Sequence, residues 1–145
     1  MTRCSGRDGT DAGSRLGANV VDLRIEAVEA NVRLARLVGS GLASQAGVTT
    51  EELDDLRLAI DEACWALIAS GARGALELRF ELIGRRLTVG ISGNVSEPVR
   101  RLPASSAGML DAVTAGWSLT SDRRHTCVLL VIRPGHACPE REGEQ

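Results

Sequence analysis

The segment from Thr49 to about Ser70 constrains the fold more than any other part of the chain. It begins with Thr49-Thr50-Glu51-Glu52, a capping box in which a threonine hydroxyl and a glutamate three residues later satisfy the first free amides of a helix. Gly71 follows the segment and is typical of a helix end. Apolar side chains recur at helical spacing along it, so one face of this helix is expected to pack against another layer. These positions are Leu53, Leu56, Ile60, Ala63, Cys64 and Leu67.

The remaining elements follow from the period of the apolar residues. Alternation of apolar and polar side chains predicts half-buried strands, and a longer period predicts helices. The predicted strands are Val20–Ile25, Ala75–Leu82, Arg86–Ser92, Trp117–Thr120 and Thr126–Arg133, and the further helices are Ala27–Gln45 and Ala107–Ala115. Helices and strands are segregated in this order and do not alternate one for one. The sequence therefore predicts an α+β two-layer sandwich: a mixed, mostly antiparallel sheet with helices on one face.

The length of 145 residues fits one domain, which we place at residues 19–134. Residues 1–18 are rich in glycine, serine, aspartate and arginine and are expected to form a disordered tail. Residues 135–145 are charged and are expected to form a flexible C-terminal tail.

Composition excludes several function classes. The formal net charge of −2 offers no electrostatic case for nucleic acid or an anionic membrane. All 17 basic residues are arginines, which excludes the lysine chemistry of P-loops and Schiff bases. No stretch approaches the ~20 apolar residues of a membrane span, and Met1–Leu16 has no apolar signal core, so a cytoplasmic location is expected.

The cysteines and histidines indicate no metal site. The four cysteines are scattered without a CxxC pair, and the only histidines are His125 and His136, whereas structural metal sites need clustered ligands. Cys64 lies among apolar residues of the predicted helix and Cys127 at the start of an apolar strand, so both are expected to be buried free thiols.

Two segments carry a resemblance to a known family. The residues Asp55-Leu56-Arg57-Leu58-Ala59-Ile60-Asp61-Glu62-Ala63-Cys64 resemble the first box of the RsbW/SpoIIAB group, the anti-sigma factor serine kinases of the GHKL (histidine-kinase-like) ATPase superfamily. Asn31-Val32-Arg33-Leu34-Ala35-Arg36 resembles the family's first helix, in which an arginine preceded by alanine faces the sigma factor. The resemblance spans about Val20 to Arg133. It implies the Bergerat ATPase fold and partner contacts at Arg36, Asn31 and Arg33.

The resemblance also implies where a nucleotide would bind, and the residues there depart from the family pattern. The family has a general-base glutamate and, four residues later on the same helix face, an asparagine that ligates Mg²⁺. The matching positions are Glu62 and Ala66, so the carboxylate is present and the metal ligand is absent. The family's Asp-x-Gly box falls on Ser92 and Asn94, and its glycine-rich turn keeps only Gly108. We therefore expect a degenerate nucleotide pocket with Glu62 as a residual catalytic carboxylate.

Three functions remain open at this point. The first is an anti-sigma factor that sequesters an alternative sigma factor, is released by an anti-anti-sigma partner of the STAS type and has no kinase activity or cofactor. The second is an active serine/threonine-protein kinase that phosphorylates the anti-anti-sigma factor, with ATP, Mg²⁺ and Glu62 as base. The third is a non-catalytic ATPase-fold subunit of a larger signalling complex. The resemblance also implies a homodimer formed through the open sheet face.

Two side chains have a functional and an ordinary interpretation. Trp65 lies by helical phase on the flank shared by Leu58 and Glu62. Its indole either occupies space that a nucleotide uses in active relatives or packs against the neighbouring helix. Arg36 is either an anchor for the sigma factor, since arginine is enriched at binding hot spots, or a solvated helix charge.

Overall fold

The computed structural model describes residues 18–135 of the chain. Its elements are β1 (Asn19–Glu26), a 3₁₀ turn η2 (Glu29–Asn31), α1 (Val32–Gln45), α2 (Thr50–Ala69), β2 (Arg73–Ile83), β3 (Arg86–Asn94), α3 (Ala104–Val113), β4 (Gly116–Asp122) and β5 (His125–Ile132). The predicted disordered N-terminal tail and the predicted flexible C-terminal tail lie, apart from one residue at each inner end, outside the described residues. No helix within residues 18–135 is long and apolar enough to cross a membrane.

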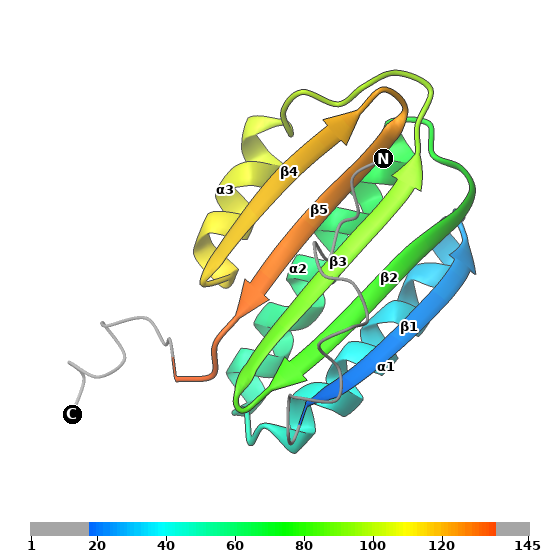
Figure 1. Cartoon of the computed structure of the whole chain (residues 1–145). Helices are drawn as coiled ribbons and strands as arrows, with labels where there is room; N and C mark the ends of the chain where they lie inside the picture. Colours follow the sequence, from blue (N-terminus) through cyan, green and yellow to red (C-terminus); the bar gives the residue numbers. More distant parts are fainter. Residues whose placement is uncertain (1–17, 136–145) are drawn as a thin grey trace.

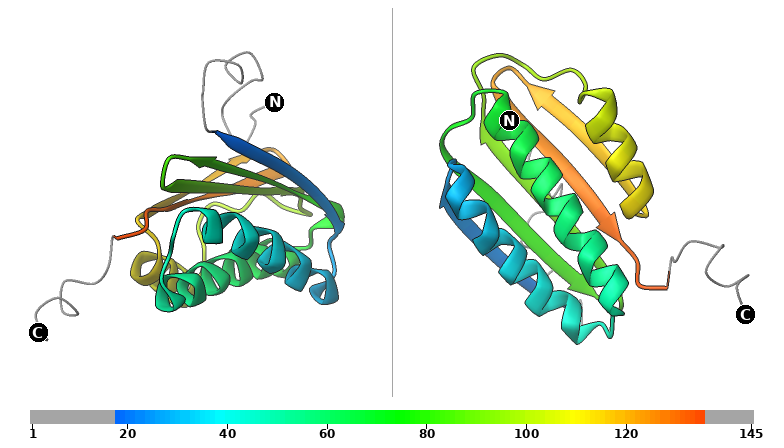
Figure 2. Two further views of the ribbon diagram at one scale, coloured as in Figure 1. Left: turned by 90° about the horizontal axis from the view of Figure 1, so that it is seen from below. Right: turned by 180° about the vertical axis from the view of Figure 1, so that it is seen from behind.

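The strands form a single open sheet in the order β1-β2-β3-β5-β4 (Figure 1). Each pair of neighbours is antiparallel, and β2–β3 and β4–β5 are hairpins. The helices lie together on one face of this sheet, as the views of Figure 2 show. The predicted α+β two-layer sandwich is confirmed, and the described strands include no parallel pair.

The core lies between the sheet and the helices. Phe80 of β2, Ile91 of β3 and Leu130 of β5 are fully buried and face Ile60 and Leu56 of α2 within one hydrophobic cluster. Full burial of such a side chain stabilises a fold by about 1.5–3 kcal/mol. On β1, Ile25 is buried against this cluster while Asp22 and Arg24 are exposed, so the charged side of this strand faces outward.

Gly39 allows α1 to lie close against α2. A Cβ atom at this position would lie 2.7 Å from Cδ1 of Ile60, a distance that no ordinary contact reaches. The glycine, which on propensity alone weakens a helix, is therefore favoured here by packing, since a larger residue would displace the end of the Ile60 side chain. The close approach brings the polar side chains along the outside of the two helices within reach of one another.

Two helix starts differ from those expected. The segment after β1 makes the 3₁₀ turn Glu29–Asn31 before α1 begins at Val32. α3 begins at Ala104, three residues earlier than predicted, because Pro103 stands at its N-cap and its carbonyl accepts the amide of Ala107 at 2.9 Å. Proline has a fixed φ that suits a helix start, and the prediction underrated this signal.

Cys64 and Cys127 are both buried, but they differ in chemistry. Cys64 is a free thiol, and burial, with a further contribution from the nearby Asp61 carboxylate, raises its pKa to about 12. The free thiol predicted at Cys127 is wrong, because this residue is disulfide-bonded.

Candidate functional site

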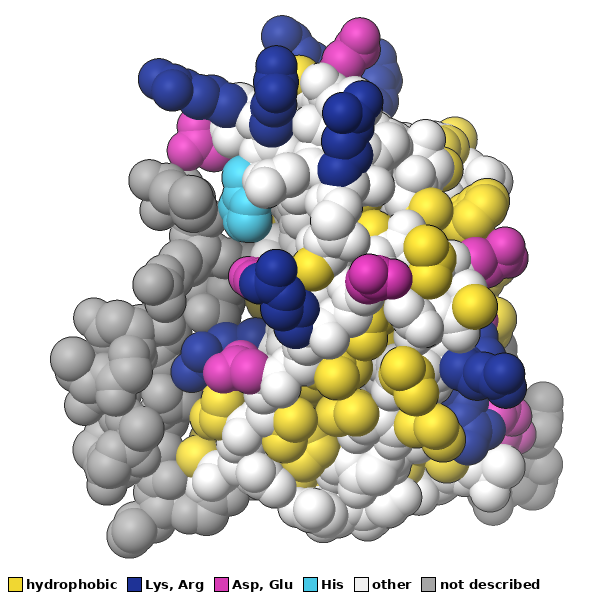
Figure 3. All heavy atoms as spheres, turned by 90° about the vertical axis from the view of Figure 1, so that its right-hand side faces the viewer, with side chains coloured by type: hydrophobic (Ala, Val, Ile, Leu, Met, Phe, Trp, Pro, Cys, Tyr) yellow, Lys and Arg dark blue, Asp and Glu magenta, His cyan; other side chains and the backbone are white. Residues whose placement is uncertain are grey.

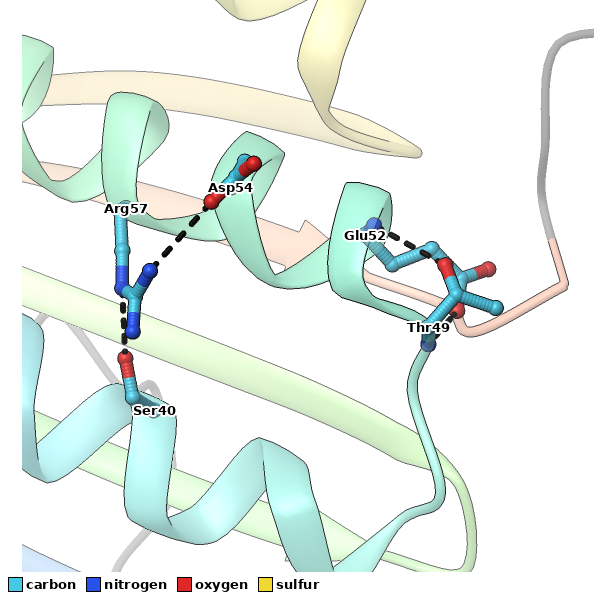
Figure 4. Close-up of polar contacts among 5 residues, drawn as sticks. All are labelled: Ser40, Thr49, Glu52, Asp54 and Arg57. Atoms are coloured by element: carbon cyan, nitrogen blue, oxygen red, sulfur yellow. Dashed lines mark hydrogen bonds and ion pairs between the residues drawn. The ribbon is translucent and has the colours of Figure 1, made fainter.

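Polar contacts join α1 to α2 at regular steps along their outer seam. Arg57 Nε donates to Ser40 Oγ at 3.2 Å, and Figure 4 shows this contact together with the bond from Arg57 to Asp54. One turn further along, Arg36 Nη1 donates to Asp61 Oδ1 at 2.6 Å. Both contacts recur after four residues on each helix, as expected for two antiparallel helices whose i and i+4 side chains share a face.

The capping box fixes where α2 begins and therefore the register of this seam. The amide of Glu52 donates to Thr49 Oγ1 at 3.1 Å, and the amide of Thr49 donates to Glu52 Oε1 at 2.9 Å (Figure 4). Both halves of the predicted capping box are present. A shift of one residue at this start would rotate Asp61 away from Arg36, since successive helical residues are 100° apart.

A cleft of about 310 Å³ opens beside the Arg36–Asp61 pair. Its lining residues are Glu29, Val32, Arg36, Asp61, Glu62 and Trp65. Another four-residue step along the seam leads to Val32 on α1 and Trp65 on α2, and the short valine leaves the indole 49% exposed. About half of the indole surface is thus open to the cleft.

Glu62 lies at the junction of this cleft and α3. Ser106 Oγ donates to Glu62 Oε2 at 2.6 Å, and Ser106 is itself buried in the first turn of α3. α3 packs directly against α2, so the carboxylate predicted to act as a base is held by a hydroxyl of the same chain. The contact between Ser106 and Glu62 was not predicted, because it depends on how α3 packs against α2.

The structure does not bring Ser92 and Asn94 to the helix side of the sheet. Side chains alternate along β3, and Leu87, Val89 and Ile91 belong to the core between sheet and helices. Ser92 and Asn94 therefore belong to the opposite face, and Asn94 Oδ1 lies 3.4 Å from His125 Nδ1 of β5. The structure therefore places these two residues on the other face of the sheet from Glu62.

The inward position at this end of β3 is Gly93. A Cβ here would lie 2.9 Å from Cδ2 of the buried Leu76, with Ala72 also within 4 Å, so the core already fills the space of an aspartate side chain. Ala66 occupies the position that matches the family's metal ligand, and it is buried within the hydrophobic core cluster. Gly108, expected in a glycine-rich turn, lies inside α3 with open space at its Cβ.

These placements do not fit Mg-ATP. Within residues 18–135, no three aspartate, glutamate, histidine or cysteine side chains are grouped so as to hold a metal ion. The phosphate-wrapping turn is replaced by regular helix, and the carboxylate for adenine has no counterpart on the inner face of β3.

The predicted partner-binding residues lie at the start of α1. Asn31 Nδ2 donates to the carbonyl oxygen of Glu26 at 3.3 Å and closes the 3₁₀ turn, while Arg33 is exposed. Only Arg36 joins Glu62 and Trp65 at the cleft. Asp61 and Glu29 complete the site and were missed, because their contacts depend on how α1 and α2 pack.

Comparison with known proteins points to one group, although no family model matches the chain. Over 76 residues, the chain is 32% identical to serine-protein kinase RsbW of Bacillus subtilis (strain 168); the match covers 50% of this chain and 48% of the relative. RsbW of Bacillus thuringiensis (strain Al Hakam) is 24% identical over 109 residues, or 61% of this chain and 68% of the relative. The chain thus spans about half the length of the first of these relatives. These matches, together with the two-layer fold, show that the chain is similar to the RsbW serine-protein kinases.

Proposed function

We propose that the chain is a cytoplasmic anti-sigma factor that binds a sigma factor through the α1–α2 surface around Arg36, and that it acts without kinase activity. The proposal rests on the contrast between Glu62, whose carboxylate is already hydrogen-bonded within the chain, and Arg36, whose side chain is accessible at the cleft. Glu62, the residual catalytic carboxylate, accepts a hydrogen bond from Ser106 of the same chain. Arg36 instead lies at an open cleft with its side chain 37% exposed.

Binding without chemistry fits the geometry of Arg36. Asp61 holds one guanidinium nitrogen of Arg36, which fixes the side chain while leaving its remaining donors for a partner. A partner carboxylate could then bind a preorganised group at a small loss of side-chain entropy. Release would follow when an anti-anti-sigma protein of the STAS type competes for the same surface, and a homodimer through the open sheet face belongs to the same proposal.

The test is direct binding to sigma factors encoded alongside this chain. Arg36→Glu is expected to weaken the complex about tenfold or more, equivalent to ~1.4 kcal/mol, because a charge reversal places like charges at the contact. Arg86→Glu, the same substitution at the exposed first residue of β3, is the matched control and is expected to leave affinity unchanged. Equal affinities of the two variants would contradict the assignment of the surface.

The alternative function is an active serine kinase. It is favoured by the carboxylate of Glu62 and by the similarity to RsbW proteins, which are serine-protein kinases. Incubation with γ-labelled ATP and a STAS-domain partner separates the two proposals. We expect no transfer of label; transfer that is lost in Glu62→Gln would establish the kinase.

A further inference from the structure

The cleft between α1 and α2 is negatively charged. Three of its lining residues are carboxylates, Glu29, Asp61 and Glu62, whereas Arg36 is the only cation among them. The 2.6 Å contact between Arg36 and Asp61 balances one charge of each sign. Glu29 and Glu62 therefore set the sign of the cleft, which repels anions and attracts cations.

An aromatic surface borders the same space. Trp65 is 49% exposed and lines the cleft together with the apolar Val32. The face of an indole ring carries partial negative charge and attracts ammonium and guanidinium groups. Trp65 lies in the same cleft lining as the carboxylates that would accept hydrogen bonds from such a group.

Size and charge also limit what can enter. A volume of about 310 Å³ is at the lower end of the roughly 300–1,000 Å³ of small-molecule sites. The space suits one long side chain. A nucleotide would bring phosphate charge next to Glu29 and Glu62, with no metal-holding group among the described residues to offset it.

We propose that this cleft is a receptor for one arginine side chain of a protein partner. The guanidinium plane would stack on Trp65 and donate to the carboxylates of Glu29 and Glu62, a combination that planar arginine makes better than lysine. Val28, next to Glu29, and Leu58, one turn before Glu62, are exposed large hydrophobics, so an arginine flanked by apolar residues fits best. Figure 3 shows hydrophobic side chains interspersed with charged ones on the adjoining side of the molecule. The inference rests on the proposed function only in assigning this arginine to a sigma factor or its antagonist.

The experiment uses N-acetyl-arginine amide as probe and the full chain labelled with ¹⁵N. The two indole signals, of Trp65 and Trp117, are followed during titration at constant ionic strength. We expect a saturable shift of the Trp65 signal, with Trp117 unmoved, because Trp117 lies near α3, where its indole donates to Asp111 at 2.8 Å. N-acetyl-citrulline amide, which has the same shape without the charge, is expected to cause no shift.

Substitutions identify the groups that bind the probe. Trp65→Leu and Glu29→Gln should each raise its dissociation constant about two- to fivefold, as expected for loss of ~0.5–1 kcal/mol. Glu97→Gln, the same change on an exposed loop away from the cleft, is the matched control. Binding of the Trp65→Leu variant is read from amide shifts of α1, and circular dichroism verifies that each variant is folded.

Three outcomes would overturn the inference. One is the absence of any shift at Trp65, another is an equal response to the citrulline probe, and the third is a shift that grows with protein concentration alone, which would mean that a second copy fills the cleft. The proposed function is tested independently, because Arg36→Glu reports on sigma binding whether or not the cleft accepts an arginine. A probe that fails while Arg36→Glu still weakens the sigma complex would refute the cleft and leave the anti-sigma proposal intact.

Discussion

Arg36 and Asp61 form the shortest ion pair across the α1–α2 seam, yet both side chains remain more than a third exposed, at 37% and 39%. Water competes for each group, and salt screens the pair, so its geometry says more about orientation than about stability. An arginine side chain that is oriented by a weak, exposed ion pair is suited to binding. A partner can add hydrogen bonds to it without first breaking a strong interaction within the chain.

The first prediction separates these two roles of the pair. Arg36→Ala and Asp61→Asn are each expected to lower the free energy of unfolding by less than ~1 kcal/mol, as for other exposed ion pairs. Urea unfolding followed by circular dichroism measures the change. A loss above ~3 kcal/mol in either variant would show that the pair is effectively buried, as removal of one buried partner typically costs that much.

The second prediction concerns Cys64, whose pKa burial raises to about 12 from an ordinary value of 9.0. The thiol should resist iodoacetamide at pH 8 in the folded chain and react after unfolding, as peptide mapping by mass spectrometry will show. A raised pKa stabilises the fold fully below pH 9, and this contribution is lost as the pH rises from 9 towards 12.

The dependence of stability on alkaline pH can be assigned to thiol groups in this protein. The chain has no lysine and no tyrosine, so thiols are the side chains that titrate over this range. Cys64→Ala should therefore flatten the decline in stability as the pH rises from 9 to roughly 10.5, because unfolded thiols lose their proton over this range. Rapid alkylation of folded Cys64 at pH 8 would contradict the placement of its thiol in the core.

Ser92 shows why single residues are harder to predict than elements. The strand β3 was expected from its alternation, and the structure contains it, but the motif was placed one position from the inward face. A register error of one residue moves a side chain to the opposite face of a sheet. Gly93 occupies the inward position but has no side chain, so the apolar alternation of the strand gives no signal there. Its crowding by Leu76 follows only from the pairing of β2 with β3.

At the scale of elements, α2 was predictable because its signals are local. A capping box at Thr49, the helical spacing of apolar residues and the glycine after Ser70 all lie within the segment itself. The seam between α1 and α2 was not predictable, because it depends on the close approach at Gly39 and on the relative rotation of two helices. The same dependence explains why Asp61 and Glu29 were missed.

The third prediction tests the start of α2. Thr49→Ala should destabilise the fold by about 1 kcal/mol, whereas Thr49→Ser, which keeps the hydroxyl, should stay close to the original chain. Thermal unfolding measures both. A Thr49→Ser variant as unstable as Thr49→Ala would show that the capping bond seen in Figure 4 contributes little.

Glu52 of the same capping box also makes the stability of the fold depend on pH under acidic conditions. Desolvation by burial pushes the pKa of Glu52 upward, but the hydrogen bonds from the amides of Thr49 and Gly135 outweigh it and hold the pKa below 4.5. A lowered pKa stabilises the fold above pH 4.5, and this contribution is lost as the pH falls through the folded value. Glu52→Gln should therefore reduce the acid sensitivity of unfolding in that window.

At the scale of the whole molecule, the two faces of the sandwich differ in chemistry. The open face of β1 and β2 carries ion pairs, among them Arg24–Glu77 at 3.1 Å and Arg79–Asp22 at 3.5 Å. The helix layer carries the cleft and most of the exposed large hydrophobics, including Leu37. The proposed protein contacts would thus lie on the helix layer, whereas the space between helices and sheet, where a nucleotide would need room, is filled by the core.

The last prediction follows from this filled interior. A ligand that binds only the folded chain stabilises it by about 2.7 kcal/mol at a hundredfold excess over its dissociation constant. We expect millimolar Mg-ATP to leave the thermal midpoint unchanged, with RsbW of Bacillus subtilis as positive control. Restoring the metal ligand alone, in Ala66→Asn, should also fail, because Ser106 still engages Glu62 and Gly93 still leaves no inward carboxylate. A stabilisation of the original chain by Mg-ATP but not by Mg²⁺ alone would mean that the interior opens to admit a nucleotide, and the kinase would then replace the binding protein as the better account of this fold.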